Sequence, residues 1–431
     1  MTRQIESVAV LGCGTMGAGL AAINAAAGCR VLMLDLTTEA AEAGLARVDP
    51  ALHDRLTVGS FDDDLPRAAD ADWIVEVVVE DVDIKRQLFR RAEEVRRDGS
   101  IVTSNTSGIP LRDLSAGMSD RFRADVAITH FFNPPQVMRL FELVPGVDTD
   151  PEVIEALTHH AAARLDKGVV HAKDTPNFIG NRVGCFFMLS GLHQAKPYLE
   201  RGMTQETIDG VLGHPLGLPP TGMYGLMDLI GLDVIDLVAR NLESNLAAGD
   251  PGLAYTSFPE VEQRMLERGQ VGRKAGGGFG RVTKLEDGSR KKETFDLTTE
   301  AWRPAVEPDL SVVPGELGEV LFTESEQGHL AWDVFGGGLR YAADLVPEIS
   351  DDVVNVDRAM RWGFNWAQGP FELLDTVGPA RVIDRIRGEG AQPPTMLRVL
   401  EETGAQTFYR RAEGGEEFLG HDGRWYPVPP A

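Results

Sequence analysis

The chain has 431 residues, which at roughly 150 residues per domain suggests about three domains. Its contents of 43% hydrophobic and 25% charged residues are ordinary globular values and exclude a mostly disordered protein. A net charge of −24, from 42 Lys and Arg against 66 Asp and Glu, argues against general nucleic-acid binding, because neutralising phosphates needs excess cations. The 3 cysteines form no disulfide framework and no C-x-x-C pair, so we expect a cytoplasmic protein.

One uncharged stretch, from Ser7 to Cys29, is long enough on length alone to span a bilayer. Its apolar content is largely Ala and Gly, and glycines from Gly12 to Gly19 lie where a spanning helix should be most apolar. We therefore predict a strand, a turn and a buried helix here, and no membrane-spanning segment.

The first half of the sequence alternates short apolar runs with helical patterns. Strands are predicted at the apolar runs 7–11, 31–34, 73–79, 101–103 and 124–129. A helical pattern follows the first run as far as Ala27, where Gly28 should end it, and another occupies 84–97. Continuous apolar strands separated by helices predict an α/β fold, with a parallel sheet covered on both faces.

The pattern changes to long amphipathic segments from about Thr175. A long helix is predicted over 178–200, and Thr204 should cap the next one. The glycine-rich segment 272–280 predicts a loop, and the polar segment 282–327, with its three prolines, predicts a linker with at most short strands. A weak repeat relates 224–231 to 371–378, through an aromatic residue, an apolar pair, an Asp and a Gly. We infer two all-helical domains related by duplication, at 174–281 and 328–431, after a first domain at 1–173.

A G-x-G-x-x-G motif spans residues 12–17, between a predicted strand and a predicted helix. Gly12 permits a tight turn, Gly14 lets the backbone approach a pyrophosphate, and Gly17 allows close packing of helix and strand. Asp35, at the end of the second strand, suits ribose hydroxyls and would repel a 2′-phosphate, which favours NAD over NADP. Cys13 is expected to be a small buried residue without chemistry. The predicted fold is thus a Rossmann-type doubly wound sheet, with Gly12, Gly14, Thr15, Met16, Gly17 and Asp35 at the cofactor.

A histidine and a glutamate stand at positions where each needs a partner. His130 lies at the end of a predicted strand, where open parallel sheets place their ligands. Glu142 interrupts the apolar run 140–144, and a carboxylate there is costly unless it is paired. Pairing the two would satisfy both groups, fix the imidazole tautomer and raise its basicity, as a general base requires.

These features together resemble the 3-hydroxyacyl-CoA dehydrogenase family. Its motifs occur in the family's order: the glycine motif at 12–17, Ser-Asn-Thr-Ser at 104–107, His-Phe-Phe-Asn-Pro at 130–134 and Asp-Thr-Pro-Asn-Phe-Ile-Gly-Asn-Arg at 174–182. A Gly-Arg-Lys segment at 272–274 extends the similarity over about 6–280, and the duplicated tail is similar to the longer, multifunctional-type members.

The resemblance implies NAD-dependent oxidation of L-3-hydroxyacyl-CoA to 3-oxoacyl-CoA in fatty acid beta-oxidation, without a metal. His130 matches the family's catalytic base and Glu142 its partner. Ser107 matches a residue near the nicotinamide and the substrate oxygen, and Asn181 an amide that helps to position the acyl thioester. The residues implied on the NAD side are Glu80, Lys85 and Asn133.

Structural roles are the alternatives at four of these positions. Ser107 could satisfy only the backbone of a turn, and Asn181 could cap or bridge helices. Glu80 and Lys85, at a strand–helix junction, could simply be solvated. The second helical copy has no counterpart of His130 and is expected to be structural.

Two alternatives to the main function remain. In the family, a lysine-rich arm helps to hold the CoA nucleotide, but here a short acidic segment occupies 37–64. The chain could therefore be a dehydrogenase of a hydroxy acid that is not a thioester. A non-catalytic NAD-binding partner of an enoyl-CoA hydratase is the other.

Besides the acyl-CoA substrate, we expect a separate hydratase subunit as a candidate partner, since the chain leaves no length for a fused one. Two helical copies could bury internally the surface through which single-copy relatives dimerise, so monomer and dimer both stay open.

Overall fold

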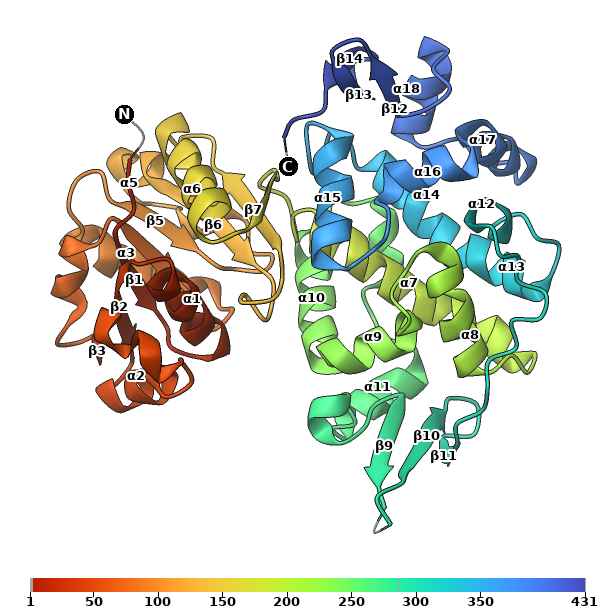
Figure 1. Cartoon of the computed structure of the whole chain (residues 1–431), viewed down its shortest axis with the longest axis horizontal. Helices are drawn as coiled ribbons and strands as arrows, with labels where there is room; N and C mark the ends of the chain where they lie inside the picture. The colour runs from red at the N-terminus through yellow and green to blue at the C-terminus, as the bar shows by residue number, and fades with distance from the viewer. Residues whose placement is uncertain (1–2, 286, 431) are drawn as a thin grey trace. The chain divides into compact units, whose positions relative to one another are not determined.

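The computed structural model describes residues 3–285 and 287–430, which form two compact units (Figure 1). The first unit contains the described residues up to Phe178, and the second contains 179–430. No helix among these described residues combines the length and the apolar character that crossing a membrane requires.

An eight-stranded sheet in the order β3-β2-β1-β4-β5-β6-β7-β8 forms the centre of the first unit. All neighbouring strands pair in parallel except β6 and β7, which are antiparallel. The Rossmann-type α/β sheet is therefore confirmed, with one reversal of direction that was not predicted. The connection 132–139 explains the reversal, because parallel neighbours need a crossover of a dozen or more residues. The strands are β1 Ser7–Leu11, β2 Arg30–Asp35, β3 Leu56–Ser60, β4 Trp73–Glu76, β5 Ile101–Ser104, β6 Val126–Phe131, β7 Leu140–Pro145 and β8 Gly168–His171.

Helices cover the sheet of the first unit. Leu20 of α1 and Leu157 of α6 pack in one hydrophobic core with Val8 and Val10 of β1. The predicted end of the first helix is correct, since Gly28 follows α1 with a φ of 94°. The helices are α1 Thr15–Ala26, α2 Thr38–Leu45, α3 Val82–Val95, α4 Leu111–Leu114, α5 Asp120–Ala124 and α6 Pro151–Arg164.

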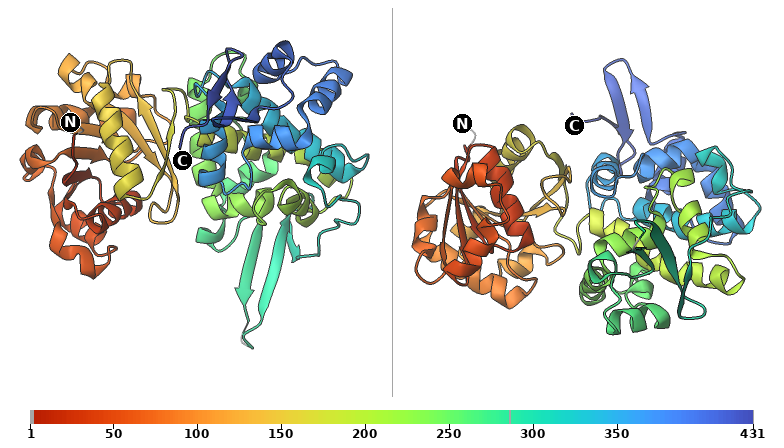
Figure 2. Two further views of the ribbon diagram at one scale, coloured as in Figure 1. Left: turned by 45° about the horizontal axis from the view of Figure 1, so that its top comes forward. Right: turned by 60° about the horizontal axis from the view of Figure 1, so that its bottom comes forward.

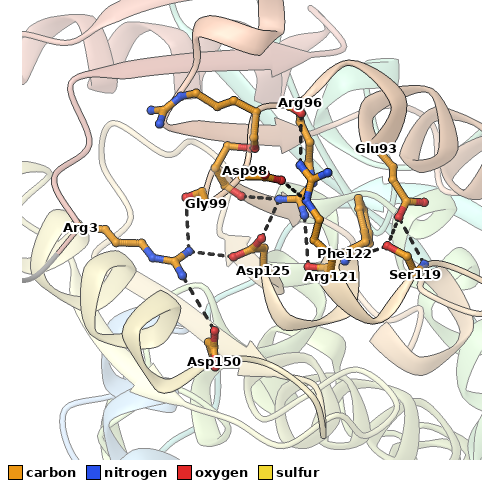
Figure 3. A network of polar contacts seen from close by, with 12 residues as sticks. Arg3, Glu93, Arg96, Asp98, Gly99, Ser119, Arg121, Phe122, Asp125 and Asp150 are labelled. Carbon is orange, nitrogen blue, oxygen red and sulfur yellow. Dashed lines mark hydrogen bonds and ion pairs between the residues drawn. The ribbon is translucent and has the colours of Figure 1, made fainter.

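A network of charged side chains closes the edge of the sheet at which β5 and β6 begin (Figure 3). The two carboxylate oxygens of Asp125 accept hydrogen bonds from Arg3 at 2.8 Å and from Arg96 at 2.9 Å. The Arg96 side chain is fully buried, and it also donates to the carbonyl of Ser100 at 2.7 Å. Because this edge is opposite the C-terminal ends of the parallel strands, the network stabilises the fold and is not part of the candidate site.

The second unit is mainly helical and carries two small three-stranded antiparallel sheets, whose projecting hairpins are visible in Figure 2. Its first helix confirms the predicted long helix, and Thr204 caps the next by accepting from the backbone N–H of Thr207. The helices are α7 Gly180–Glu200, α8 Gln205–Val211, α9 Gly222–Ile230, α10 Leu232–Asn245, α11 Glu260–Glu267, α12 Leu317–Val320, α13 Glu326–Ala331, α14 Gly337–Asp344, α15 Val353–Gly363, α16 Pro370–Val377, α17 Pro379–Gly388 and α18 Thr395–Thr403.

The segment 282–327 holds more structure than the short strands that the sequence predicts. It contains most of a sheet formed by β9 Gly280–Lys284, β10 Arg290–Asp296 and β11 Ala301–Pro304. Arg303 attaches this sheet to α8 through two hydrogen bonds of 2.8 Å to the carboxylate of Glu206. Only the second half of β10 is buried, so the strand shows little of the alternation that reveals strands in a sequence.

Four aspartates, of which Asp228 and Asp357 are buried and the other two are half-buried, make matching contacts in the two halves of the second unit. Asp209 accepts from backbone N–H groups in the first turn of α9, and Asp357 does the same at α16. Asp228 accepts from the N–H groups at the start of β9, and Asp375 from those at the start of the second sheet. The duplication stays a prediction, which this parallel supports. The strands of the second sheet are β12 Tyr409–Ala412, β13 Gly415–Leu419 and β14 Trp425–Pro427.

Candidate active site and cofactor site

The glycine turn after β1 has the geometry that dinucleotide binding requires. Gly12 has a φ of 107°, and a Cβ atom there would lie 2.7 Å from the carbonyl oxygen of Val77. A Cβ at Gly17 would lie 1.8 Å from the carbonyl oxygen of Gly12, so the helix can approach the strand only without a side chain at this position. Both glycines are thus required by packing.

The first turn of α1 fits a phosphate group. A Cβ at Gly14 would meet no atom within 4 Å, so that side of the turn is open. The helix has no side-chain cap and no acidic residue in its first turn, which begins with Thr15 and Met16. Uncapped N–H groups and the positive end of the helix dipole favour an anion, and the turn therefore fits the pyrophosphate of a dinucleotide.

Asp35 lies at the end of β2 beside this turn. Its carboxylate accepts from the backbone N–H of Cys13 and from that of Leu36, each at 2.7 Å. These bonds hold the carboxylate against the glycine turn, and its remaining lone pairs can still accept from ribose hydroxyls. Burial, followed by the charge of Asp35, raises the pKa of the Cys13 thiol to about 12, consistent with the expectation that it has no chemistry.

The predicted histidine–glutamate pair is present in the structure. His130 on β6 lies directly opposite Glu142 on the antiparallel strand β7, and its Nδ1 is 2.6 Å from Oε2 of Glu142. The side chain of His130 is 5% exposed and that of Glu142 is fully buried. The rings of Phe132 and Phe178 lie 4.7 and 5.7 Å from the imidazole, between centroids, and confine its orientation.

Lys85 is buried in an ionic cluster and is not solvated. Its Nζ donates to the two carboxylate oxygens of Glu76 at 2.8 and 3.0 Å and lies 3.2 Å from Oε2 of Glu80. Lys85 is 1% exposed, whereas the side chain of Glu80 is 21% exposed. Burial raises the pKa of the Glu76 carboxyl, although the Lys85 ammonium opposes this effect.

The Ser-Asn-Thr-Ser segment connects this cluster to the strand of His130. Glu80 accepts from the backbone N–H of Ser107 at 2.8 Å and from the hydroxyl of Thr106. The side-chain oxygen of Asn105 accepts from the backbone N–H of Phe131 at 2.9 Å, one residue after His130. Ser107 is therefore held between the acidic cluster and β6, at the edge of the sheet where the parallel strands end.

Three residues that contact this cluster were not among the predicted site residues: Glu76, Ser104 and Thr106. Ser104 donates through its hydroxyl to Oε2 of Glu76. A signal for Glu76 is present in the sequence, because this carboxylate interrupts the apolar run 73–79 just as Glu142 interrupts its own run.

The two remaining predicted residues lie in different parts of the chain. Asn133 is exposed in the connection after β6 and precedes Pro134 through a cis peptide bond. Asn181 is a half-buried residue in the first turn of α7, in the second unit. Among residues 3–285 and 287–430, no cluster of His, Cys, Asp and Glu has the arrangement of a metal site.

Comparison with known domains decides the family. The NAD binding domain of 3-hydroxyacyl-CoA dehydrogenase matches residues 7–175, and the C-terminal domain of the same enzyme matches 178–282. This chain belongs to the 3-hydroxyacyl-CoA dehydrogenase family. The glycine turn is therefore part of the family's NAD-binding domain, and NAD is the cofactor.

Relatives of this 3-hydroxyacyl-CoA dehydrogenase family member include longer proteins. A Bacillus subtilis protein named as a probable 3-hydroxyacyl-CoA dehydrogenase is 34% identical over 96% of this chain and 56% of its own length. A Rickettsia felis protein named as a fatty acid oxidation complex trifunctional enzyme is 34% identical over 87% of this chain and 53% of its own. The chain thus spans about half the length of these curated relatives.

A solved structure shares the fold along most of the chain. The 3-hydroxybutyryl-CoA dehydrogenase of Escherichia coli K12 matches with a TM-score of 0.71 at 24% identity, covering 93% of this chain and 99% of that one. At this identity the similarity concerns the fold.

Proposed function

We propose that this family member oxidises L-3-hydroxyacyl-CoA to 3-oxoacyl-CoA with NAD, as a step of cytoplasmic fatty acid beta-oxidation. The observation that carries the proposal is the buried pair of His130 and Glu142, at the sheet edge where the glycine turn also lies. Oxidising a secondary alcohol requires one group that accepts a proton and another that accepts a hydride. NAD supplies the hydride acceptor when it is bound.

His130 acts as the proton acceptor in this proposal. Glu142 accepts the hydrogen bond from Nδ1–H, which leaves the lone pair of Nε2 for the proton of the 3-hydroxyl. As the imidazole gains this proton, the adjacent carboxylate stabilises its positive charge. General-base catalysis of this kind contributes typically ~10²–10⁴-fold to a rate.

The other predicted residues position the reactants. Ser107 and Asn181 would donate hydrogen bonds to substrate oxygens without adding charge. Glu80, Lys85 and Asn133 would shape the NAD side. The contact of Lys85 with Glu80 supports this role, because it fixes the side chain that accepts from the backbone N–H of Ser107.

The test is NADH formation from L-3-hydroxyacyl-CoA substrates of different chain lengths. The His130→Gln variant should bind NAD normally but lose at least about 99% of turnover, the lower end of a general-base contribution. A folded His130→Gln variant with full turnover would remove the proposed base. NAD binding without turnover on any hydroxyacyl-CoA would favour a non-catalytic partner, and co-purification of an enoyl-CoA hydratase would support that role.

A second candidate is oxidation of a hydroxy acid that is not a CoA thioester. Its support is segment 37–64, where the guanidinium of Arg55 already donates to the carbonyl of Gly28 at 2.8 Å. Arg47 is exposed there, in an otherwise acidic surrounding. Comparing each CoA thioester with its free acid and its pantetheine thioester separates the candidates. Activity on the free acid alone would favour the second.

A further inference from the structure

Lys167 places its ammonium group under the loop that follows the catalytic strand. The residue lies between α6 and β8 and is 8% exposed. Its Nζ donates to the carbonyl oxygens of Pro135 and Met138, the second at 2.8 Å. The next backbone N–H, that of Gly168, donates to the carbonyl of Arg139 at 2.9 Å. Donors from two consecutive residues, Lys167 and Gly168, thus bind three carbonyl groups of one short loop.

This arrangement is costly for the stability of the fold. Burial lowers the pKa of Lys167, although the charge of the neighbouring Asp166 opposes this effect, and the Nζ hydrogen bonds given for the described residues go to carbonyl oxygens. Buried charges are ordinarily paired, because two carbonyl dipoles replace only part of the lost hydration. The C-terminal end of α6 attracts a cation, but Nζ binds loop carbonyls and none of the helix. A lysine at this position therefore suggests a role in holding the loop.

The loop, residues 132–139, connects the two strands that carry His130 and Glu142. It also contacts the dinucleotide helix on its other side, since a Cβ at Gly19 of α1 would lie 2.5 Å from Cγ of Pro135. Pro135 is accordingly held between α1 and the ammonium of Lys167. Because β8 begins at the edge where β6 ends, Lys167 reaches this loop from within the same sheet.

We propose that Lys167 is a positioning residue, which fixes the loop 132–139 against α1 and so places Asn133 for NAD binding. The inference rests on the NAD-side role given to Asn133 in the proposed function. Lys167 itself touches neither cofactor nor reacting atoms in this role; it acts through the carbonyls of Pro135 and Met138.

The test measures NAD affinity of the full chain by calorimetry, without an acyl substrate. Lys167→Met keeps most of the length of the side chain and removes its charge and donors. It should weaken NAD binding roughly tenfold, the upper end of the loss expected when one neutral hydrogen bond, that of Asn133 to the cofactor, is misplaced. Lys167→Arg retains donors and should stay within about threefold of the natural chain, since guanidinium can also bind carbonyls. Lys292→Met, at an exposed position in the first half of β10, is the matched control and should change nothing.

Hydrogen exchange of the loop amides gives the second readout, and they should exchange faster in Lys167→Met. A lower melting temperature with unchanged NAD affinity and unchanged loop exchange would show a purely structural lysine and overturn the proposal. Should the methionine variant fail to fold, Gly19→Ala displaces Pro135 from the α1 side, and unchanged NAD affinity there would also overturn it. Because substrate is absent, failure of the proposed oxidation would leave these results unaffected.

Discussion

Replacing Glu142 by Gln removes the negative charge beside the imidazole and changes the shape of the side chain very little. The altered contact is the 2.6 Å hydrogen bond between Nδ1 of His130 and Oε2 of Glu142, with both side chains buried. A hydrogen bond to a charged group contributes about 1.5–3 kcal/mol. At 1.36 kcal/mol per tenfold change in rate, its loss should reduce kcat roughly 10- to 100-fold. If the new amide donates to Nδ1, the ring proton moves to Nε2 and the loss approaches the full ~10²–10⁴-fold of general-base catalysis.

The assay is steady-state NADH formation, with NAD affinity and melting temperature measured on the same preparation. We expect kcat to fall while both Michaelis constants change little, because the charge acts on the protonated imidazole of the transition state. Glu152→Gln is the matched control, since that side chain is 71% exposed on α6. A folded Glu142→Gln variant whose kcat stays within about twofold of the natural chain would refute the pairing as a source of basicity.

Three further predictions concern stability and the cofactor. Asp125→Asn leaves the buried guanidinium of Arg96 in Figure 3 without its counter-charge and should lower the free energy of unfolding by about 3–5 kcal/mol. Asp120→Asn, at a side chain that is 96% exposed, should lower it by less than about 1 kcal/mol; denaturant titration of both variants checks this, and equal losses would contradict it. Burial lowers the pKa of His160 to about 4, so this histidine takes up its proton at a higher pH in the unfolded chain than in the folded one. The free energy of unfolding of the natural chain, compared with that of His160→Gln, should therefore decline by about 3 kcal/mol between about pH 6.5 and about pH 4, and parallel pH–stability curves of the two would argue against this. Gly14→Ala should keep the melting temperature and weaken NAD binding, whereas Gly17→Ala should lower both; an identical pattern in the two variants would be evidence against the assigned roles.

The sequence predicts the first unit well where its strands are continuous apolar runs. β1, β2, β5 and β6 lie within a few residues of their predicted positions, because such runs need burial on both faces. β3 and β8 were not predicted, since each is short and mixes polar with apolar residues. The reversal between β6 and β7 follows from the length of their connection and could have been derived.

The candidate site also contains residues that a sequence rule predicts and residues whose surroundings no sequence pattern reveals. The rule that a buried carboxylate needs a partner predicts the contact of Glu142 with His130. The same rule applied to Glu76 predicts a partner, which the structure shows to be Lys85. Lys167 carries no such signal, because its surroundings are created by a loop that is distant in sequence. The role of Asn181 depends on the second unit and stays a prediction.

The histidine and its glutamate are only 12 residues apart and face each other across one hairpin. Their facing positions are therefore set by the pairing register of two adjacent strands and by the length of the loop that joins them. Since successive side chains of a strand point to opposite faces, a one-residue shift of β7 along β6 would turn the carboxylate away from the imidazole. Length changes in this hairpin should consequently be far less tolerated than those in the outlying loops.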